Sequence, residues 1–136
     1  MVHYLILIHG DIGGNFRLLR HAESLSRIEG SHVTVVGQKI TEIPNSIDRN
    51  RRIKIKSVAP FLQTHIFYRI ILFPIECLYY LFVYLSLLIR IGRVDAIITS
   101  TAPLVVSYLL GKLAKRITKG KLVYDLAPMK YVINAN

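Results

Sequence analysis

The stretch from Tyr4 to Arg17 constrains the fold of this chain more than any other. An apolar run of strand length begins at Tyr4 and leads into a loop with glycines at positions 10, 13 and 14. Apolar residues at spacings of three and four follow the loop, and this spacing predicts a helix. A strand, a glycine-rich loop and a helix in this order predict the opening of a βαβ unit.

The glycine-rich loop is expected to bind a ligand. Glycines let backbone N–H groups approach a ligand closely, and the N-terminus of the following helix favours negative charge. The spacing of Gly10, Gly13 and Gly14 is neither the GxGxxG of dinucleotide-binding proteins nor a P-loop. No acidic residue ends the second predicted strand, where Gly37 and Gln38 stand instead. We therefore expect a phosphate or a sugar at this loop.

Predicted strands and helices alternate along the rest of the chain. Further strands are predicted at His32–Val36, Arg52–Val58, Arg93–Ser100 and Lys121–Asp125. This alternation predicts an α/β, Rossmann-like parallel sheet with helices on both faces, in a single domain over residues 1–136. Right-handed crossovers predict the strand order 3-2-1-4-5, with ligands at the carboxyl ends of the strands, near strands 1 and 4.

Three segments are expected to meet at that edge of the sheet and to form the site. They are the loop His9–Asn15, the turn Thr99–Pro103 and the end of the last strand at Asp125. Each directly follows a predicted strand, and the carboxyl ends of parallel strands lie at one edge.

A long apolar segment, Ile70–Ile89, lies between the third and fourth predicted strands. A helix of about 20 residues is ~30 Å long, enough to cross a bilayer. Pro74 and Glu76 interrupt it, and a spanning helix would place two strands of one sheet on opposite sides of the membrane. We expect a helix packed on the sheet with its outer face in the membrane interface. A helix fully buried in protein and a transmembrane span are the alternatives.

The formal net charge of +10 indicates an anionic partner, either an acidic lipid surface or a phosphorylated substrate. No recognised nucleic-acid module is visible, so nucleic acid is not expected to bind. The alternating basic residues of Arg52–Val58 are typical of a solvated edge strand, with attraction of anionic lipid as the alternative. One cysteine, Cys77, and five scattered histidines form no disulfide or metal-ligand pattern, so we expect no metal and no cofactor.

Several motifs in the chain together resemble those of one enzyme family. They are Gly10-Asp11-Ile12-Gly13, Arg17, His21-Ala22, Ser24-Leu25-Ser26, His32–Gly37, Asn50–Ile53, the long apolar helix, Ala102-Pro103 and Lys121–Asp125. In these features the chain resembles the N-terminal half of the chitobiosyldiphosphodolichol β-mannosyltransferases. Members of that family are glycosyltransferases of the two-domain GT-B architecture.

This resemblance implies inverting transfer of mannose from the donor substrate GDP-mannose. The acceptor would be the 4-hydroxyl of the outer GlcNAc on a dolichyl pyrophosphate, in the assembly of the lipid-linked oligosaccharide for protein glycosylation. The implied location is the cytosolic face of the endoplasmic reticulum membrane. We expect the C-terminal domain that would hold most of the GDP-mannose to be absent, and the chain alone to be inactive.

Inversion needs a general base beside the acceptor hydroxyl and stabilisation of the departing nucleotide phosphate. Asp11 is the candidate base, and a turn residue that bonds its own backbone is the alternative. His9 and His21 are weaker candidates, for which a structural role is favoured. Arg17 and the loop amides are expected to contact a pyrophosphate. The residues expected to bind substrate are Gly10, Ile12, Gly13, Gly14, Arg17, His21, Thr101, Pro103 and Asp125.

Two motifs depart from the family pattern. The family usually has Gln-Asn-Pro-Pro in place of Ser100–Pro103, and Asp-Trp-His-Asn in place of Asp125–Pro128. Three interpretations therefore stay open. The chain is the acceptor-binding half of a mannosyltransferase, a membrane-attached non-catalytic subunit that recruits a donor-binding partner chain, or an inactive remnant.

Overall fold

A parallel five-stranded sheet lies at the centre of the molecule. The computed structural model describes residues 1–60, 66–100 and 104–125. The strands are β1 (Val2–Asp11), β2 (Ser31–Gln38), β3 (Ile53–Val58), β4 (Ala96–Ser100) and β5 (Lys121–Asp125). They lie in the order β3-β2-β1-β4-β5, and all neighbouring pairs are parallel. The predicted Rossmann-like α/β fold and its 3-2-1-4-5 strand order are confirmed.

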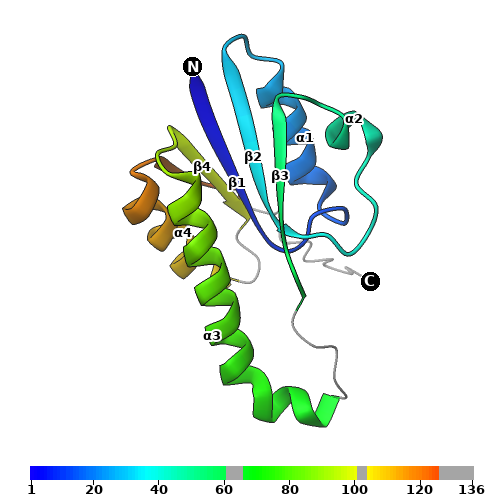
Figure 1. The fold of residues 1–136 in the computed structure, drawn as a ribbon, viewed down its shortest axis with the longest axis vertical. Coiled ribbons are helices and arrows are strands. Elements are labelled where there is room, and N and C mark those ends of the chain that lie inside the picture. The colour runs from blue at the N-terminus through cyan, green and yellow to red at the C-terminus, as the bar shows by residue number, and fades with distance from the viewer. Residues whose placement is uncertain (61–65, 101–103, 126–136) are drawn as a thin grey trace, which may run out of the picture.

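The helices cover both faces of this sheet. They are α1 (Phe16–Ser26), the short α2 (Asn45–Asp48), α3 (Ile66–Ile91) and α4 (Leu104–Thr118). The helices α1 and α2 lie on one face, and α3 and α4 lie on the other (Figure 1). The short helix α2 was not predicted, because a helix of 4 residues is too short to establish a periodic pattern.

Two hydrophobic clusters, one on each face, hold the helices to the sheet. Along β1, Ile6 and Ile8 belong to the cluster under α1, whereas Leu5 and Leu7 belong to the cluster under α3 and α4. All four side chains are at most 1% exposed. A central parallel strand is buried on both faces and therefore carries a continuous apolar run, which is why the stretch after Tyr4 was recognisable.

The strand β1 is longer than predicted, because it continues through Gly10 to Asp11. The register between β1 and β2 shifts between Leu7 and Asp11, so an irregularity lies inside this pairing. Gly10 sits there with a φ of 123°, a conformation that side chains other than glycine rarely adopt. The first glycine thus belongs to a bulged strand end, and the loop proper begins at Ile12.

The strand β3 lies at one edge of the sheet, as its alternating pattern predicts. Ile53 is buried against α1, whereas Lys54 is exposed. A charged edge discourages pairing with strands of other molecules, and this supports the solvated-edge interpretation of the basic stripe.

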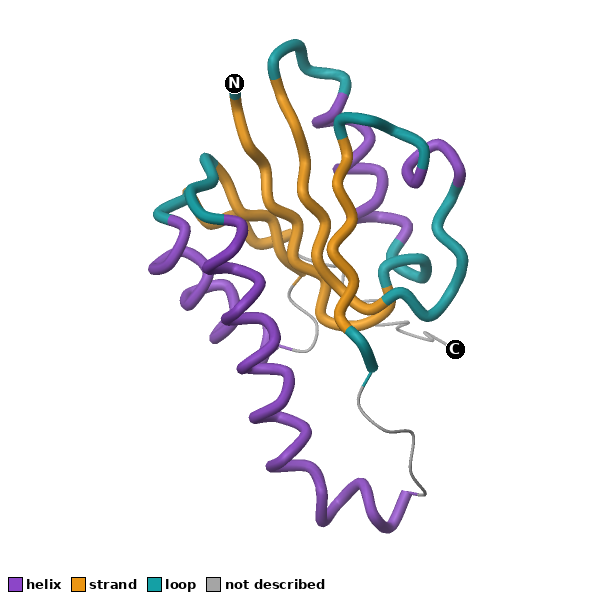
Figure 2. Tube along the Cα trace, viewed as in Figure 1, coloured by secondary structure: helices purple, strands orange, loops and turns teal. Residues whose placement is uncertain are grey.

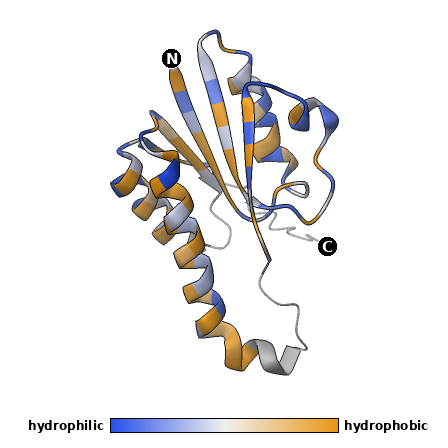
Figure 3. Ribbon diagram, viewed as in Figure 1, coloured by the Kyte–Doolittle hydropathy of each residue, from blue (hydrophilic) through white to orange (hydrophobic). Residues whose placement is uncertain are grey.

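The helix α3 packs on the sheet over only part of its length. Its C-terminal half contributes Tyr84 and Leu88 to the core, at 1% and 0% exposure. Its N-terminal half extends beyond the carboxyl ends of the strands (Figure 2) and is mainly apolar (Figure 3). The segment Ile70–Ile91 has a hydropathy of 1.9, and only 6% of its most apolar 18-residue window is buried. The described part of the chain therefore does not bury this helix completely.

The helix α3 also connects two strands of one sheet. It leaves β3 and returns to β4, and both strands run parallel in the same five-stranded sheet. By length and composition the helix could cross a membrane, but the strands that it joins would then lie on opposite sides. The first turns of α3 run at an angle to the rest (Figure 1), and Pro74 lies inside the helix, where a proline bends the axis.

Candidate functional site

The carboxylate of Asp11 is the centre of the glycine-rich loop. Its two oxygens accept hydrogen bonds from the backbone N–H groups of Gly13 and Gly14, at 3.3 and 3.0 Å. They also accept bonds from the N–H groups of Ile40 and Thr41, both at 3.0 Å, and from the Thr41 hydroxyl. Asp11 therefore ties the loop after β1 to the segment after β2.

These donors favour the ionised form of Asp11. Hydrogen bonding by the Thr41 hydroxyl, followed by the N–H groups of Thr41, Ile40 and Gly14, lowers the Asp11 pKa from 3.8 to about 2. A carboxylate with this pKa is a weak base at neutral pH. The geometry thus favours the structural alternative for Asp11, a turn residue that bonds the backbone around it, while its role as the base stays a prediction.

Gly13 is required by the close approach of the segment after β2. A Cβ at this position would lie 2.4 Å from the Thr41 hydroxyl oxygen and 2.6 Å from the carbonyl oxygen of Glu42. Ile12, in contrast, is fully buried in the cluster under α1, so its side chain anchors the loop to the core instead of lining a site.

The helix α1 begins directly after this loop. The Asn15 side chain caps it by accepting a hydrogen bond from the N–H group of Leu18 at 3.3 Å. Because the helix is amphipathic, Leu18, Leu19 and Ala22 point into the core, whereas Arg17 and His21 lie on its exposed side. Arg17 and His21 lie one turn apart, on the side of α1 that faces the end of β5.

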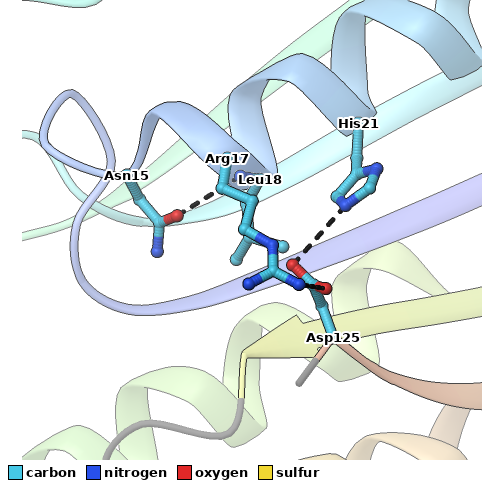
Figure 4. Close-up of polar contacts among 5 residues, drawn as sticks. All are labelled: Asn15, Arg17, Leu18, His21 and Asp125. Carbon is cyan, nitrogen blue, oxygen red and sulfur yellow. Dashed lines mark hydrogen bonds and ion pairs between the residues drawn. The ribbon is translucent and has the colours of Figure 1, made fainter. Parts of the chain in front are cut away.

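Arg17 and His21 converge on Asp125 at the end of β5 (Figure 4). The Arg17 guanidinium donates a hydrogen bond to one carboxylate oxygen of Asp125, and the His21 Nε2 lies 3.5 Å from the other. The Asp125 side chain is only 14% exposed, whereas those of Arg17 and His21 are 44% and 47% exposed. We refer to these three residues as the Asp125 cluster.

His9 directly precedes Gly10 of the glycine-rich loop, and its side chain lies on the face of the sheet that α3 and α4 cover. It borders a cavity of about 490 Å³ between α3 and α4, which we call the α3–α4 groove. Burial lowers the pKa of His9 below its ordinary value, although the nearby Glu76 opposes this shift. Burial thus favours the neutral form of the His9 imidazole, which is the form that can accept a proton.

The sequence-predicted site residues thus fall into two groups in the structure. Asp11, Gly13 and Gly14 form the loop, and Arg17, His21 and Asp125 form the Asp125 cluster beside it, at the carboxyl edge of the sheet. Two further predicted residues, Thr101 and Pro103, lie outside the described residues. Within the described part of the chain, no three His, Cys, Asp or Glu side chains gather where they could hold a metal ion.

Sequence reasoning missed two features of this region. Thr41 lies in a polar segment without periodicity, and nothing in the local pattern identifies it as a partner of Asp11. The α3–α4 groove joins residues of β1, α3 and α4, and their separation in the chain hides it from sequence analysis. Only the cluster of tyrosines in α3 gave a signal, since Tyr80 and Tyr84 both line this groove.

The fold and the position of the site define the class of protein. This chain is a Rossmann-like α/β domain with its candidate site at the carboxyl edge of the sheet, beside the central strand β1. A comparison with known protein families, characterised proteins and solved structures finds no match to the chain.

Proposed function

We propose that this chain is the acceptor-binding half of a mannosyltransferase that extends a lipid-linked chitobiosyl pyrophosphate with mannose from GDP-mannose. One observation carries the proposal above all. The glycine-rich loop and the Asp125 cluster lie at the carboxyl edge of the sheet, and the exposed apolar half of α3 extends past that same edge (Figure 1). A polar site for a head group thus lies next to a surface suited to lipid.

The exposed face of α3 supports attachment to a membrane surface. Large apolar side chains at spacings of three, four and seven residues form one stripe along the helix, and each is between 55% and 74% exposed. They are Ile71, Ile75, Leu78, Phe82 and Ile89. Such a stripe suits a helix that lies in the membrane interface, and the net charge of +10 suits an anionic surface. We propose the cytosolic face of the endoplasmic reticulum membrane as its location.

The Asp125 cluster and the start of α1 support recognition of the pyrophosphate. Arg17 lies in the first turn of α1, where the N-terminus of the helix favours negative charge. The Arg17 guanidinium is held in place by Asp125 and is still 44% exposed, so it can contact an anion without large rearrangement.

Two candidate bases lie near the loop. Asp11 accepts hydrogen bonds from Gly13, Gly14, Ile40 and Thr41, and its pKa of about 2 makes it a poor proton acceptor at neutral pH. Burial lowers the pKa of His9 and so favours the neutral imidazole, which can accept a proton. Asp11 is already saturated with hydrogen bonds. This also fits the second candidate function, a membrane-attached subunit that recruits a partner chain for the sugar donor.

The proposal is tested with a water-soluble acceptor analogue, chitobiosyl pyrophosphate on a short aglycone. We expect the chain alone to bind this analogue in calorimetry, and expect Arg17→Gln to weaken binding about tenfold, since a charge-assisted contact contributes about 1.5 kcal/mol or more. Arg27→Gln, at the other end of α1, is the matched control and leaves binding unchanged. Absence of binding by the unmodified chain would refute the proposed function.

Mannose transfer is tested separately with GDP-mannose and the same analogue. We expect no transfer by the chain alone, and transfer when a donor-binding domain is supplied. Transfer by the chain alone would show that it needs no second domain. The recruiting subunit would be favoured if the chain binds the acceptor analogue and captures a donor-binding chain. In that case neither His9 nor Asp11 should contribute to the rate of mannose transfer.

A further inference from the structure

The α3–α4 groove has apolar walls and only a few polar groups. Phe73 and Leu81 of α3 face Leu109 and Leu110 of α4 across it. Its volume of about 490 Å³ falls within the range of about 300–1,000 Å³ that is typical of small-molecule sites. The candidate base His9 lines it, whereas Gly10, Gly13, Gly14 and the Asp125 cluster do not, so the groove adjoins the candidate site at the end of β1.

One side of the groove is continuous with the exposed apolar surface of α3 and α4. Phe73, Leu81 and Leu109 line the groove and are also 60%, 48% and 60% exposed. They adjoin the apolar stripe on α3, which includes Leu78 and Phe82. A hydrocarbon chain can therefore pass from a membrane surface into the groove without crossing water, and this lowers the cost of its transfer.

The polar groups of the groove are His9 at the end of β1 and, on α3, Glu76, Cys77, Tyr80 and Tyr84. His9 precedes Gly10 directly, and its ring lies edge-on to Tyr80, with the ring centroids 6.4 Å apart. Tyr84 reaches the same strand, where its hydroxyl donates to the carbonyl oxygen of Ile8 at 2.9 Å. The groove therefore leads from the apolar surface to the strand that carries the glycine-rich loop.

We propose that the α3–α4 groove binds the isoprenoid chain of the lipid-linked acceptor, at the units nearest to its pyrophosphate. This inference rests on the proposed function and assigns the lipid-binding part of the same substrate to residues of α3 and α4. The groove holds the hydrocarbon, and the carboxyl edge of the sheet holds the head group. The acyl chain of a phospholipid would fit the apolar walls of the groove equally well, but it would not bring a pyrophosphate to the glycine-rich loop.

Cys77 allows a direct test, because it lines the groove, is exposed and is the single cysteine of the chain. The probe is farnesyl pyrophosphate, below its micelle concentration, and the readout is the rate at which a water-soluble maleimide modifies Cys77. At saturation we expect the rate to fall at least about tenfold, since less than about a tenth of the groove is then empty. Inorganic pyrophosphate alone leaves the rate unchanged.

Neighbouring residues that point out of the groove provide matched controls. In a Cys77→Ser background, a thiol introduced by Leu78→Cys lies on the exposed stripe, and farnesyl pyrophosphate should not protect it. Leu81→Trp fills the groove and should weaken the protection of Cys77 about tenfold, as bulky insertions into packed sites do. Phe82→Trp, on the outer face, should leave it intact.

Three results would overturn this inference. They are an unchanged rate for Cys77, equal protection of the thiol in the Leu78→Cys variant, and equal protection of Cys77 by phosphatidylcholine vesicles without any farnesyl pyrophosphate. If Cys77 is not protected while the soluble acceptor analogue still binds, the groove assignment fails and the proposed function stands. If Cys77 is protected but the analogue does not bind, the proposed function fails instead.

Discussion

The guanidinium of Arg17 donates a hydrogen bond to the carboxylate of Asp125, although 108 residues separate them in the chain. Arg17 lies in the first turn of α1 and Asp125 ends β5, so this pair connects the helix after the central strand to the edge of the sheet. Because His21 faces the second oxygen of the same carboxylate, one acidic group holds both side chains beside the glycine-rich loop.

We predict that Asp125→Asn strengthens the binding of inorganic pyrophosphate about fivefold. The substitution removes a negative charge that competes with the anion for Arg17, and a change of about 1 kcal/mol is expected for a partly exposed pair. Glu23→Gln is the matched control, because it also removes one negative charge, from the Glu23–Arg27 pair on α1. Equal strengthening by both variants, measured by calorimetry, would mean that only net charge matters.

We predict that Asp11→Asn destabilises the protein by about 1 kcal/mol at pH 7. The carboxylate accepts bonds from the N–H groups of Gly13, Gly14, Ile40 and Thr41, and charge-assisted bonds are the stronger kind. Solvent screening at this partly exposed site limits the loss. Urea unfolding measures it. Asp48→Asn, which removes only the exposed Lys39 pair at 3.8 Å, should change stability by less than about 0.5 kcal/mol.

The same carboxylate makes stability depend on pH. The Asp11 pKa is about 2 in the folded chain and 3.8 without these contacts. The unfolded chain therefore binds the proton more tightly, and the stabilisation is complete above pH 3.8 and lost as the pH falls toward 2. We expect the stability difference between the natural chain and Asp11→Asn to shrink over this window. A difference that stayed constant from pH 7 to pH 2 would contradict the assigned pKa.

We predict that Gly13→Ala destabilises the protein by about 1–3 kcal/mol, through overpacking. The added Cβ would lie 2.6 Å from the Glu42 carbonyl oxygen, so the segment after β2 must move. Gly14→Ala is the control, because the nearest atom, the Asp11 Oδ2, lies 3.0 Å away and needs to shift by only a few tenths of an ångström. Thermal unfolding compares the two variants. An equal loss of stability in both would show that position 13 has no special role.

We predict salt-sensitive binding to anionic liposomes. The apolar stripe on α3 should insert into the interface, while the net charge of +10 attracts the surface and is screened as salt increases. Phe82→Asp should weaken binding at least about tenfold in flotation assays, because it removes apolar area and adds a charge. Val123→Asp, on the exposed edge strand β5, should weaken it much less. Failure to bind at low salt would contradict the membrane interpretation of α3.

We predict that Tyr84→Phe costs about 0.5–1.5 kcal/mol. The buried hydroxyl donates to the carbonyl oxygen of Ile8 at 2.9 Å, so its loss removes one hydrogen bond between α3 and the end of β1. Tyr79→Phe removes a longer bond of 3.3 Å to the Ala59 carbonyl oxygen on the exposed side of α3. We expect less than about 0.5 kcal/mol for that variant in urea unfolding.

Local patterns were sufficient to predict the five strands, the longer helices and the strand order. Apolar runs and spacings are set by neighbours in the chain, and right-handed crossovers restrict how such elements assemble. The basic alternation of Arg52–Val58 likewise predicted the edge strand β3. The end of β1 was predicted less well, because the bulge at Gly10 depends on pairing with β2.

The sequence by itself thus determined the Rossmann-like sheet and the edge at which a site would lie. Only the tertiary structure decided what the site residues contact: Asp11 is saturated by donors from the segment after β2, Arg17 is paired with Asp125, and α3 leaves a groove beside His9. These contacts join residues far apart in the chain, and they exist only once the elements pack. Periodicity predicts which face of an element is buried, whereas partners are chosen by the packing of the whole domain.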